Sequence, residues 1–232
     1  MKGFILAAGE GTRLHPLTLE IPKPLLPVGK IPIITYLIEL YLNHGVNDIK
    51  INIQKKHLED FYKWKAVYFP REKIDFLVEE KPTGTFTPLV KVGEDWFSEP
   101  IVVSNGDELK ELNLKEMVDF HFQKKALATI GLVKVADPQN YGVVLCNLGV
   151  VTQFLEKPKR PPSKYINSGL YVLGPGIRNY FPKGAGFAMV EKDLFPQLAK
   201  EGKLFGYKYE GKWMDIGDFE RWEKAIQEWN KK

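Results

Sequence analysis

Small and cationic residues near the amino terminus have the types and spacing of a polyphosphate site. Gly9 and Gly11 follow a short apolar run at residues 4–8 that predicts a buried strand. Glycines let the backbone approach an anion and turn its N–H groups toward it, and Arg13 adds a permanent cation. Lys23 stands between two prolines, which restrict the backbone around it. We therefore predict a pocket for a polyphosphorylated ligand.

Two common phosphate-binding motifs do not account for this stretch. The pattern GxxxxGK[S/T] is absent, and Gly9-Glu10-Gly11 lacks the third glycine of the dinucleotide-binding fingerprint. A purely structural turn between a strand and a loop would need the same glycines. The local pattern alone therefore leaves both interpretations open.

Two aspartates far apart in the sequence could hold a divalent cation beside such a ligand. Asp107 follows an apolar run at residues 101–104, and Asp215 lies in the segment WMDIG. Each could be structural, because Asn-Gly-Asp is a frequent turn and the nearby Asp218 could cap the last helix. Two carboxylates and a polyphosphate, however, are the usual means of holding Mg²⁺, which takes few protein ligands and keeps several waters.

The elements that must position these residues alternate between strand-like and helix-like segments. Apolar runs predict strands at residues 49–53, 74–78 and 101–104. Helices are predicted in the stretches around these runs, at residues 33–43, 58–66, about 88–97 and 114–125. Asn113 is the expected N-cap of the last of these helices. The alternation predicts an α/β protein with a Rossmann-like, mostly parallel sheet flanked by helices. Asp107 then falls at the carboxyl end of a strand, where such sheets bind ligands.

Beyond residue 126 the pattern changes to strands at 129–135, 141–146 and 150–154, which indicate an antiparallel or mixed extension of the sheet. Helices are predicted near 190–200 and 219–230. No linker, repeat or low-complexity tract separates two regions. We expect one α/β domain over residues 1–232.

Composition excludes several classes of protein. Of the 232 residues, 44% are hydrophobic and 27% are charged, as in ordinary globular proteins. No apolar run reaches membrane-spanning length, and no signal-peptide pattern is present. Cys146 is the single cysteine, which fits a reducing cytoplasm. The net charge of +4 is spread without a basic stripe, which argues against nucleic acid as a partner and suits polyanionic substrates.

The longer string LAAGEGTRLHPLT…PKPLLPV closely resembles the signature of the sugar nucleotidyltransferases, which join a nucleoside triphosphate (NTP) to a sugar 1-phosphate. The segments NGD and WMDIG are similar to the two metal-binding segments of that family, which implies Mg²⁺ on Asp107 and Asp215. After Gly217 the family commonly has Thr or Gln and then Pro, where this chain has Asp218 and Phe219. Members of the guanylyltransferase subgroup often continue into a left-handed β-helix. We expect none here, and a homo-oligomer formed through the catalytic domain stays open.

The resemblance implies two sets of binding residues. The nucleotide set comprises residues of the glycine loop and of the later segments EEKPTGT and NGD: Leu6, Ala8, Gly9, Gly11, Thr12, Arg13, Glu79, Gly84, Thr85 and Asp107. The sugar-phosphate set comprises Lys23 and residues of the segments YGV, EKP and INSGLY: Tyr141, Gly142, Glu156, Lys157, Asn167 and Gly169. Arg13, Lys23 and Lys157 are the expected catalytic residues. Read locally, the EKP segment could equally be a solvated strand end, and Gly142 could mark only a bulge.

Glu79, five residues before Gly84, suggests which nucleobase the triphosphate carries. Enzymes for uracil or thymine often carry Gln there, whereas a carboxylate only accepts hydrogen bonds. Guanine offers two adjacent donors that one carboxylate can accept together. Phe86 and Thr87 replace small residues expected in this segment, which leaves the packing against the base or ribose open.

The resemblance therefore implies a nucleotidyl transfer that releases pyrophosphate, with guanosine triphosphate (GTP) and mannose 1-phosphate as the expected substrates. A uridylyl-, thymidylyl- or cytidylyltransferase acting on another sugar 1-phosphate or on phosphocholine is an alternative. A non-catalytic ligand-sensing subunit on the same fold is a second alternative. The sequence does not identify the sugar, because discrimination among sugars depends on the geometry of hydroxyl contacts.

Overall fold

The computed structural model describes residues 1–229 and divides into two compact units. Unit 1 comprises Met1–Pro82, Ser104–Glu111 and the chain from Gly211 onward. Unit 2 comprises Thr83–Val103 and Leu112–Glu210. The expectation of one catalytic domain over the whole chain stays a prediction.

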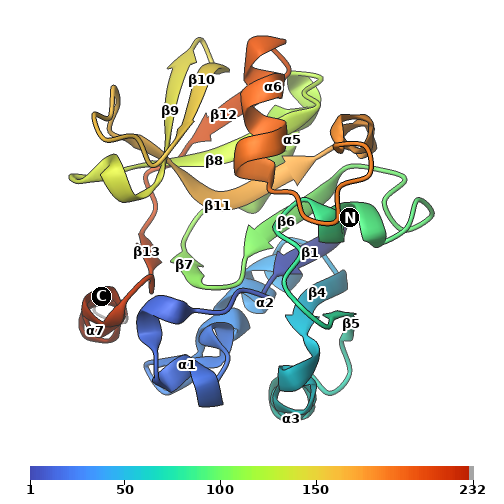
Figure 1. Cartoon of the computed structure of the whole chain (residues 1–232), viewed down its shortest axis with the longest axis vertical. Coiled ribbons are helices and arrows are strands. Elements are labelled where there is room, and N and C mark those ends of the chain that lie inside the picture. The colour runs from blue at the N-terminus through green and yellow to red at the C-terminus, as the bar shows by residue number, and fades with distance from the viewer. Residues whose placement is uncertain (230–232) are drawn as a thin grey trace. The chain divides into compact units, whose positions relative to one another are not determined.

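Unit 1 is built on three parallel strands in the order β5-β4-β1: β5 (Lys73–Glu79), β4 (Asp48–Gln54) and β1 (Lys2–Leu6). β4 is a strand because β-branched isoleucines recur at every second position and are fully buried. The helices of this unit are α1 (Leu17–Glu20), α2 (Ile33–Asn43), α3 (Leu58–Tyr68) and α7 (Phe219–Glu228). In Figure 1, α3 lies beside β4 and β5, and its Phe61 ring packs 6.0 Å from Phe76 of β5.

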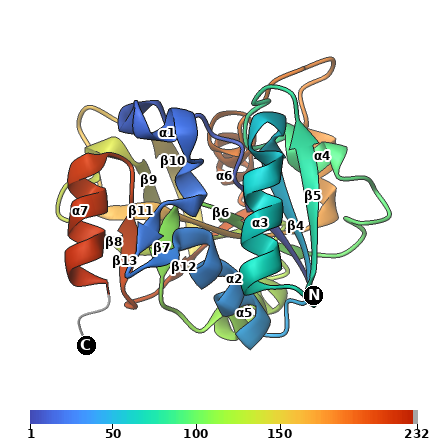
Figure 2. The same cartoon turned by 90° about the horizontal axis from the view of Figure 1, so that it is seen from below.

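Short elements of unit 1 carry four of the predicted site residues: Thr12, Arg13, Lys23 and Asp215. The 3₁₀ turns are η1 (Thr12–Leu14), η2 (Lys23–Leu25) and η3 (Lys55–His57). Two antiparallel ribbons pair β2 (Pro27–Val28) with β3 (Ile31–Pro32), and β7 (Glu108–Lys110) with β13 (Trp213–Asp215). The second ribbon joins segments about a hundred residues apart in the sequence. In both views α7 lies beside β13 (Figures 1 and 2).

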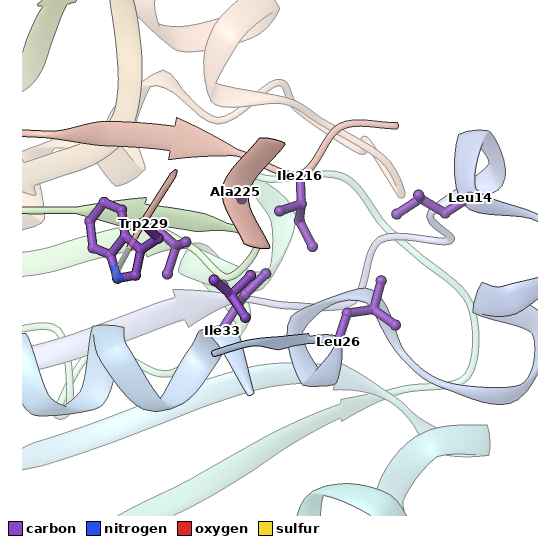
Figure 3. Packing of buried hydrophobic residues seen from close by; sticks show 8 residues of the cluster. Leu14, Leu26, Ile33, Ile216, Ala225 and Trp229 are labelled. Carbon is purple, nitrogen blue, oxygen red and sulfur yellow. The ribbon is translucent and has the colours of Figure 1, made fainter. Parts of the chain in front are cut away.

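One hydrophobic cluster of unit 1 ties these short elements together (Figure 3). It joins η1, η2, α2, the β7–β13 ribbon and α7 through Leu14, Leu26, Val28, Ile33, Leu109, Ile216, Ala225 and Trp229. Burying a Leu or Ile side chain contributes roughly 1.5–3 kcal/mol. Because Leu14 and Ile216 are buried in this cluster, they hold in place the residues that directly precede them, Arg13 and Asp215.

Unit 2 is a small closed sheet of mixed direction. Its strands are β8 (Ala128–Lys134), β9 (Gly142–Asn147), β10 (Val150–Glu156), β11 (Tyr165–Leu173) and β12 (Leu204–Lys208). The order is β11-β8-β12-β10-β9, and β11 also pairs with β9, which closes the sheet. β12 and β8 are parallel, and the other pairs are antiparallel. The residues of β6 (Ile101–Asn105) belong partly to each unit.

The helical segments of unit 2 are α4 (Thr87–Lys91), α5 (Leu114–Gln123), η4 (Pro138–Asn140), η5 (Pro175–Tyr180), the π-turn η6 (Val190–Leu194) and α6 (Phe195–Lys200). α6 packs against β10 and β11 through Phe195, whose ring lies 5.3 Å from Phe154 and 5.1 Å from Tyr171. Asn113 caps α5 by accepting a hydrogen bond from the backbone of Glu116, as predicted.

The fold prediction is confirmed at the level of a mixed α/β protein. A mostly parallel sheet is not confirmed for the whole chain, because the parallel arrangement describes unit 1 and most pairs of unit 2 are antiparallel. The helix predicted near 88–97 ends at Lys91, since Gly93 takes a left-handed conformation with φ of +94°. The last helix ends at Glu228, and Asn230 of its predicted range lies outside the described residues. Among residues 1–229, no helix is long and apolar enough to cross a membrane.

Candidate active site

The glycine loop directly follows β1, whose ladder continues through a hydrogen bond from the Ala7 N–H to the Asn52 carbonyl. Gly11 has a φ of +64°, and a Cβ there would lie 3.0 Å from the Thr18 side chain. Thr18 also donates to the Gly11 carbonyl at 2.8 Å. A Cβ at Gly9 would meet nothing within 4 Å. The loop is thus fixed at Gly11 and open to a ligand at Gly9, and Arg13 follows it on the exposed side of η1.

Lys23 begins η2 between the buried residues Pro22 and Pro24. Its ammonium group donates a hydrogen bond to Oδ2 of Asp107. Burial alone would raise the pKa of the Asp107 carboxyl, but the charge and hydrogen bond of Lys23, together with the charge of Lys110 and a backbone hydrogen bond, lower it overall. Two residues predicted for different substrates therefore form one ion pair.

The β7–β13 ribbon brings together the two predicted metal ligands, Asp107 immediately before β7 and Asp215 at the end of β13. Asp215 pairs in register with Glu108, and the Ile216 N–H donates to the Asp107 carbonyl at 3.3 Å. The Gly106 N–H donates to Leu6 at 2.9 Å, which places Asp107 at the carboxyl end of β1. No group of three or more His, Cys, Asp or Glu side chains that could hold a metal occurs among residues 1–229. Two carboxylates still fit Mg²⁺, because this ion completes its shell with water and substrate phosphate.

Asp215 is held by groups that the sequence analysis did not select. Its Oδ1 accepts hydrogen bonds from the Gly217 N–H at 2.7 Å and from Arg221 Nη1 at 3.0 Å. A Cβ at Gly217 would lie 2.5 Å from Asp215 Oδ1 and 3.3 Å from Arg13 Nη1, so only glycine fits. Asp218 caps α7 by accepting from the Arg221 N–H, as its position suggested. Arg221 was not predicted because nothing in its local pattern points to Asp215.

A buried polar network lies next to Asp107 on the same ribbon. Glu108 accepts hydrogen bonds from Asn105 at 2.9 Å, from Lys110 at 3.1 Å and from Trp213 at 3.1 Å. Burial raises the pKa of Glu108 to about 7, with Lys110 opposing the shift and Asp107 adding to it. Glu108 and Lys110 are two residues apart, so they share a face of the strand. That spacing is the one sequence signal that could have identified the pair.

Glu79 ends β5 at the same carboxyl edge as the glycine loop. It lies opposite Gln54 in the parallel register, and it is buried whereas its neighbour Glu80 is exposed. Gln54 donates to the Ala8 carbonyl at 2.8 Å. The ends of the three parallel strands therefore place Ala8, Gln54 and Glu79 along one edge of unit 1.

In unit 2 the predicted nucleotide residues Gly84 and Thr85 are joined to the segment before η6. A Cβ at Gly84 would lie 2.2 Å from the Ala188 carbonyl oxygen. Thr85 Oγ1 donates to Glu191 at 2.6 Å and accepts from the Val190 N–H at 3.0 Å. Phe86 is fully buried and packs on Phe181. The unexpected aromatic residue is thus part of the core of unit 2.

Four of the predicted sugar-phosphate residues converge where β9 begins and β10 ends. Glu156 pairs in register with Gly142, where a Cβ would lie 3.2 Å from the Glu156 carboxylate. The Lys157 N–H donates to the Tyr141 carbonyl at 3.0 Å, and its ammonium lies 3.4 Å from Glu156. Lys157 is exposed and has a φ of +48°. Its cation is therefore accessible beside a half-buried carboxylate.

Asn167 and Gly169 form a second group in unit 2. Asn167 Oδ1 accepts from the Gly169 N–H at 2.9 Å, and its amide donates to Tyr171 Oη at 2.9 Å. The pairing of β11 with β8 is irregular between Asn167 and Tyr171. Asn167 is thus part of a local hydrogen-bond network within β11.

Glu191 is a further residue that the sequence analysis did not select. It is half-buried and accepts from Thr85. Burial raises the pKa of its carboxyl, the Thr85 hydrogen bond opposes this, and the charges of Glu156 and Lys157 act on it in opposite directions. Glu191 therefore links the Gly84–Thr85 segment to the group around Glu156 within unit 2.

Unit 1 thus combines a glycine loop with two carboxylates, Asp107 and Asp215, and with the cations that pair with them, Lys23 and Arg221. The chain belongs to the nucleotidyl transferase family, whose pattern it matches over residues 2–232. It is 38% identical over 226 residues to the mannose-1-phosphate guanyltransferase of Saccharomyces cerevisiae, an alignment that covers 94% of this chain and 61% of that protein. The chain thus spans about three fifths of the length of the curated relatives it matches.

Two solved structures of other proteins have the same fold. A putative glucose-1-phosphate thymidylyltransferase from Bacillus anthracis superposes with a TM-score of 0.89 at 28% identity, covering 98% of this chain and 94% of that one. HddC from Yersinia pseudotuberculosis, solved in complex with GMP-PN, gives a TM-score of 0.83 at 27% identity over 99% of both chains. The sugar-nucleotidyltransferase resemblance of the sequence is therefore confirmed at the level of the family and the fold.

Proposed function

We propose that the chain transfers a guanylyl group from GTP to mannose 1-phosphate and releases pyrophosphate. The observation that carries the proposal is the pairing of β7 with β13, which brings Asp107, the residue before β7, next to the strand that ends at Asp215. Lys23 forms an ion pair with Asp107, and Arg221 forms one with Asp215. Carboxylates and cations at one strand edge suit a substrate that combines a divalent cation with phosphates. The similarity to mannose-1-phosphate guanyltransferases supports the choice of substrates.

In the proposed reaction a phosphate oxygen of the sugar 1-phosphate attacks the α-phosphorus of GTP. One P–O bond forms, and the bond from the α-phosphorus to the bridging oxygen of the β-phosphate breaks, so pyrophosphate leaves with the electron pair. The attacking oxygen is already anionic, so no general base is required. Catalysis then consists of positioning and charge neutralisation.

The chain's own residues divide this work. Backbone N–H groups from Gly9 to Thr12 bind the phosphates, and Arg13 neutralises the departing pyrophosphate. The resemblance to the family assigns both Lys23 and Lys157 to the phosphate that attacks. Bound to Asp107 and Asp215, Mg²⁺ would neutralise charge on the α-phosphate oxygens.

The remaining predicted residues orient the two substrates. Gly84 and Thr85 shape the segment that faces the nucleotide, while Tyr141, Gly142, Glu156, Asn167 and Gly169 receive the sugar. Glu156 and Asn167 can bind hydroxyl groups, because one accepts and the other both accepts and donates.

The buried position of Glu79 supports guanine as the base. Its carboxylate stands at the strand edge that carries the glycine loop, where it can accept from the N1–H and N2–H₂ groups of guanine. Uracil and thymine present one donor between two acceptors, and a carboxylate repels the acceptors. A uridylyl- or thymidylyltransferase is therefore the weaker alternative.

The test is a panel of the four triphosphates against several sugar 1-phosphates and phosphocholine, with Mg²⁺ and the purified chain. Release of pyrophosphate is measured for each pair. The proposal expects the highest kcat/KM for GTP with mannose 1-phosphate. A clear preference for another pair would show that the substrates are wrong but that the reaction, a nucleotidyl transfer, is right. No turnover with any pair, together with measurable nucleotide binding, would instead favour the ligand-sensing subunit.

A further inference from the structure

Arg221 makes two contacts with Asp215 and two with Asp218. Its Nη1 lies 3.0 Å from Oδ1 and 3.3 Å from Oδ2 of that carboxylate. Its Nε lies 3.4 Å from Asp218, and its backbone N–H donates to Asp218 at 3.0 Å. Only about a quarter of the Arg221 side chain and an eighth of the Asp215 side chain are exposed, at 23% and 13%. The pair is therefore partly shielded from water, unlike a surface salt bridge.

A second guanidinium approaches the same carboxylate. The position of a Cβ built on Gly217 lies 2.5 Å from Asp215 Oδ1, 3.0 Å from Arg221 Nη1 and 3.3 Å from Arg13 Nη1. Two cations so close together repel each other unless an anion lies beside them. In this structure Asp215 provides that anion.

Asp107 is arranged in the same way, with Lys23 as its cation. Each of the two carboxylates proposed to hold the metal is thus already neutralised by a side chain of unit 1. A divalent cation that binds either carboxylate must compete with that side chain. Once displaced, the side-chain cations need another anion, and the phosphates of the nucleotide can supply it.

We propose that Arg221 is a positioning residue that acts as a built-in counterion of Asp215, so that the protein binds a bare divalent cation weakly and a metal–nucleotide complex strongly. This inference rests on the proposed function, because it takes Asp215 as a metal ligand. Binding of the metal and binding of the nucleotide are coupled, because the metal binds the carboxylate while the nucleotide phosphates bind the side-chain cations that the metal displaces. The protein thereby avoids holding metal in the absence of its nucleotide.

The test measures binding of Mn²⁺ alone to the whole chain, by the paramagnetic resonance signal of free Mn²⁺. Replacing Arg221 with Gln removes the competing charge, and we expect Mn²⁺ to bind about three- to tenfold more tightly. Arg221→Lys keeps a cation that can reach Asp215, so its Mn²⁺ affinity should return to within about twofold of the unaltered chain. Arg71→Gln, at an exposed position of the same unit, should leave the affinity unchanged.

A second measurement separates the counterion role from a structural one. The GTP affinity is determined with and without Mn²⁺, and the ratio of the two should fall in Arg221→Gln by about the factor gained for Mn²⁺ alone. If Asp215→Asn weakens Mn²⁺ binding but Arg221→Gln does not strengthen it, the counterion role is wrong and the metal site stands. If no variant binds Mn²⁺ alone and Mn²⁺ does not raise the GTP affinity of the unaltered chain, both the inference and the metal site of the proposed function are wrong.

Discussion

Lys23 donates a hydrogen bond to Asp107 across 84 residues of sequence, and the pair joins η2 to the start of the β7–β13 ribbon. The sequence analysis assigned Lys23 to the sugar phosphate and Asp107 to the metal and nucleotide. Their ion pair places both charges at one point of unit 1. Under the proposed function, Lys23 therefore acts beside the phosphate that Asp107 and its metal would hold, whichever substrate supplies that phosphate.

Replacing Lys23 with Met should lower kcat by about 10²- to 10³-fold, the range found when one preorganised charge-stabilising group is lost. The substitution also leaves Asp107 without its cation. The measurement is steady-state pyrophosphate release at saturating substrates. Lys115→Met is the matched control, because Lys115 forms an exposed ion pair with Asp119 on α5 and should alter kcat by less than about twofold. Equal effects of the two substitutions would contradict a role for Lys23.

Exchanging Glu79 for Gln should shift the preference from GTP toward UTP and thymidine triphosphate. The amide replaces one acceptor with a donor, so it no longer matches two adjacent donors of guanine. The ratio of kcat/KM for GTP to that for UTP should fall by about tenfold or more, as for one hydrogen bond to a charged group. The neighbouring Glu80→Gln is the control, since Glu80 is exposed and pairs with Lys55. An unchanged ratio in Glu79→Gln would remove the argument for guanine.

A methyl group at Gly84 should destabilise the protein more than one at Gly93. Both glycines have left-handed backbones, with φ of +93° and +94°. An added Cβ lies 2.2 Å from the Ala188 carbonyl oxygen at Gly84 and meets nothing within 4 Å at Gly93. Left-handed strain of about 1 kcal/mol is common to both, so the difference between the two alanine variants isolates the collision. We expect a lower midpoint in urea for Gly84→Ala, and equal midpoints would show that the segment relaxes freely.

The buried carboxyl of Glu108 should make the protein less stable as the pH rises through the range from 4.5 to about 7. Its pKa is raised from 4.5 to about 7 on folding, so the unfolded chain loses the proton first and is favoured in that window. Asp107 has a lowered pKa, and its stabilising effect is lost only as the pH falls below 3.8. The two effects therefore occupy separate pH windows.

The measurement is the urea midpoint of the unaltered chain and of Glu108→Gln between pH 4 and 8. The difference between the two proteins removes the contribution of all other carboxyl groups. We expect the decline above pH 4.5 to be smaller in the variant. Parallel curves would show that Glu108 ionises alike in the folded and unfolded chain.

Local sequence patterns predicted those helices and strands whose formation depends on residues close together in the sequence. Asn113 and Asp218 cap α5 and α7 because short polar side chains accept from the first turn of a helix. The isoleucines of β4 specified a buried strand by themselves. The helix near residue 88 ended early because a single glycine, Gly93, takes a left-handed conformation.

The contacts that complete the site could not be predicted, because each depends on pairing over long sequence separations. β7 and β13 are three residues each and form a ribbon only against one another. Arg221 reaches Asp215 because Asp218 fixes the start of α7, and Glu191 reaches Thr85 across 106 residues. Motifs selected Asp107 and Asp215 as candidate metal ligands, but they did not indicate that Lys23 and Arg221 are their ion-pair partners.

The central claim is that the α-phosphorus of GTP is transferred to the sugar phosphate. GTP labelled on its α-phosphate should be incubated with Mg²⁺, mannose 1-phosphate and the purified chain, and the products separated by chromatography. The account predicts that the label appears in a guanosine diphosphate sugar, in equal amount to unlabelled pyrophosphate, and that Asp215→Asn abolishes its appearance. Label that stays in GTP, or that is released as guanosine monophosphate without a sugar product, would contradict the account.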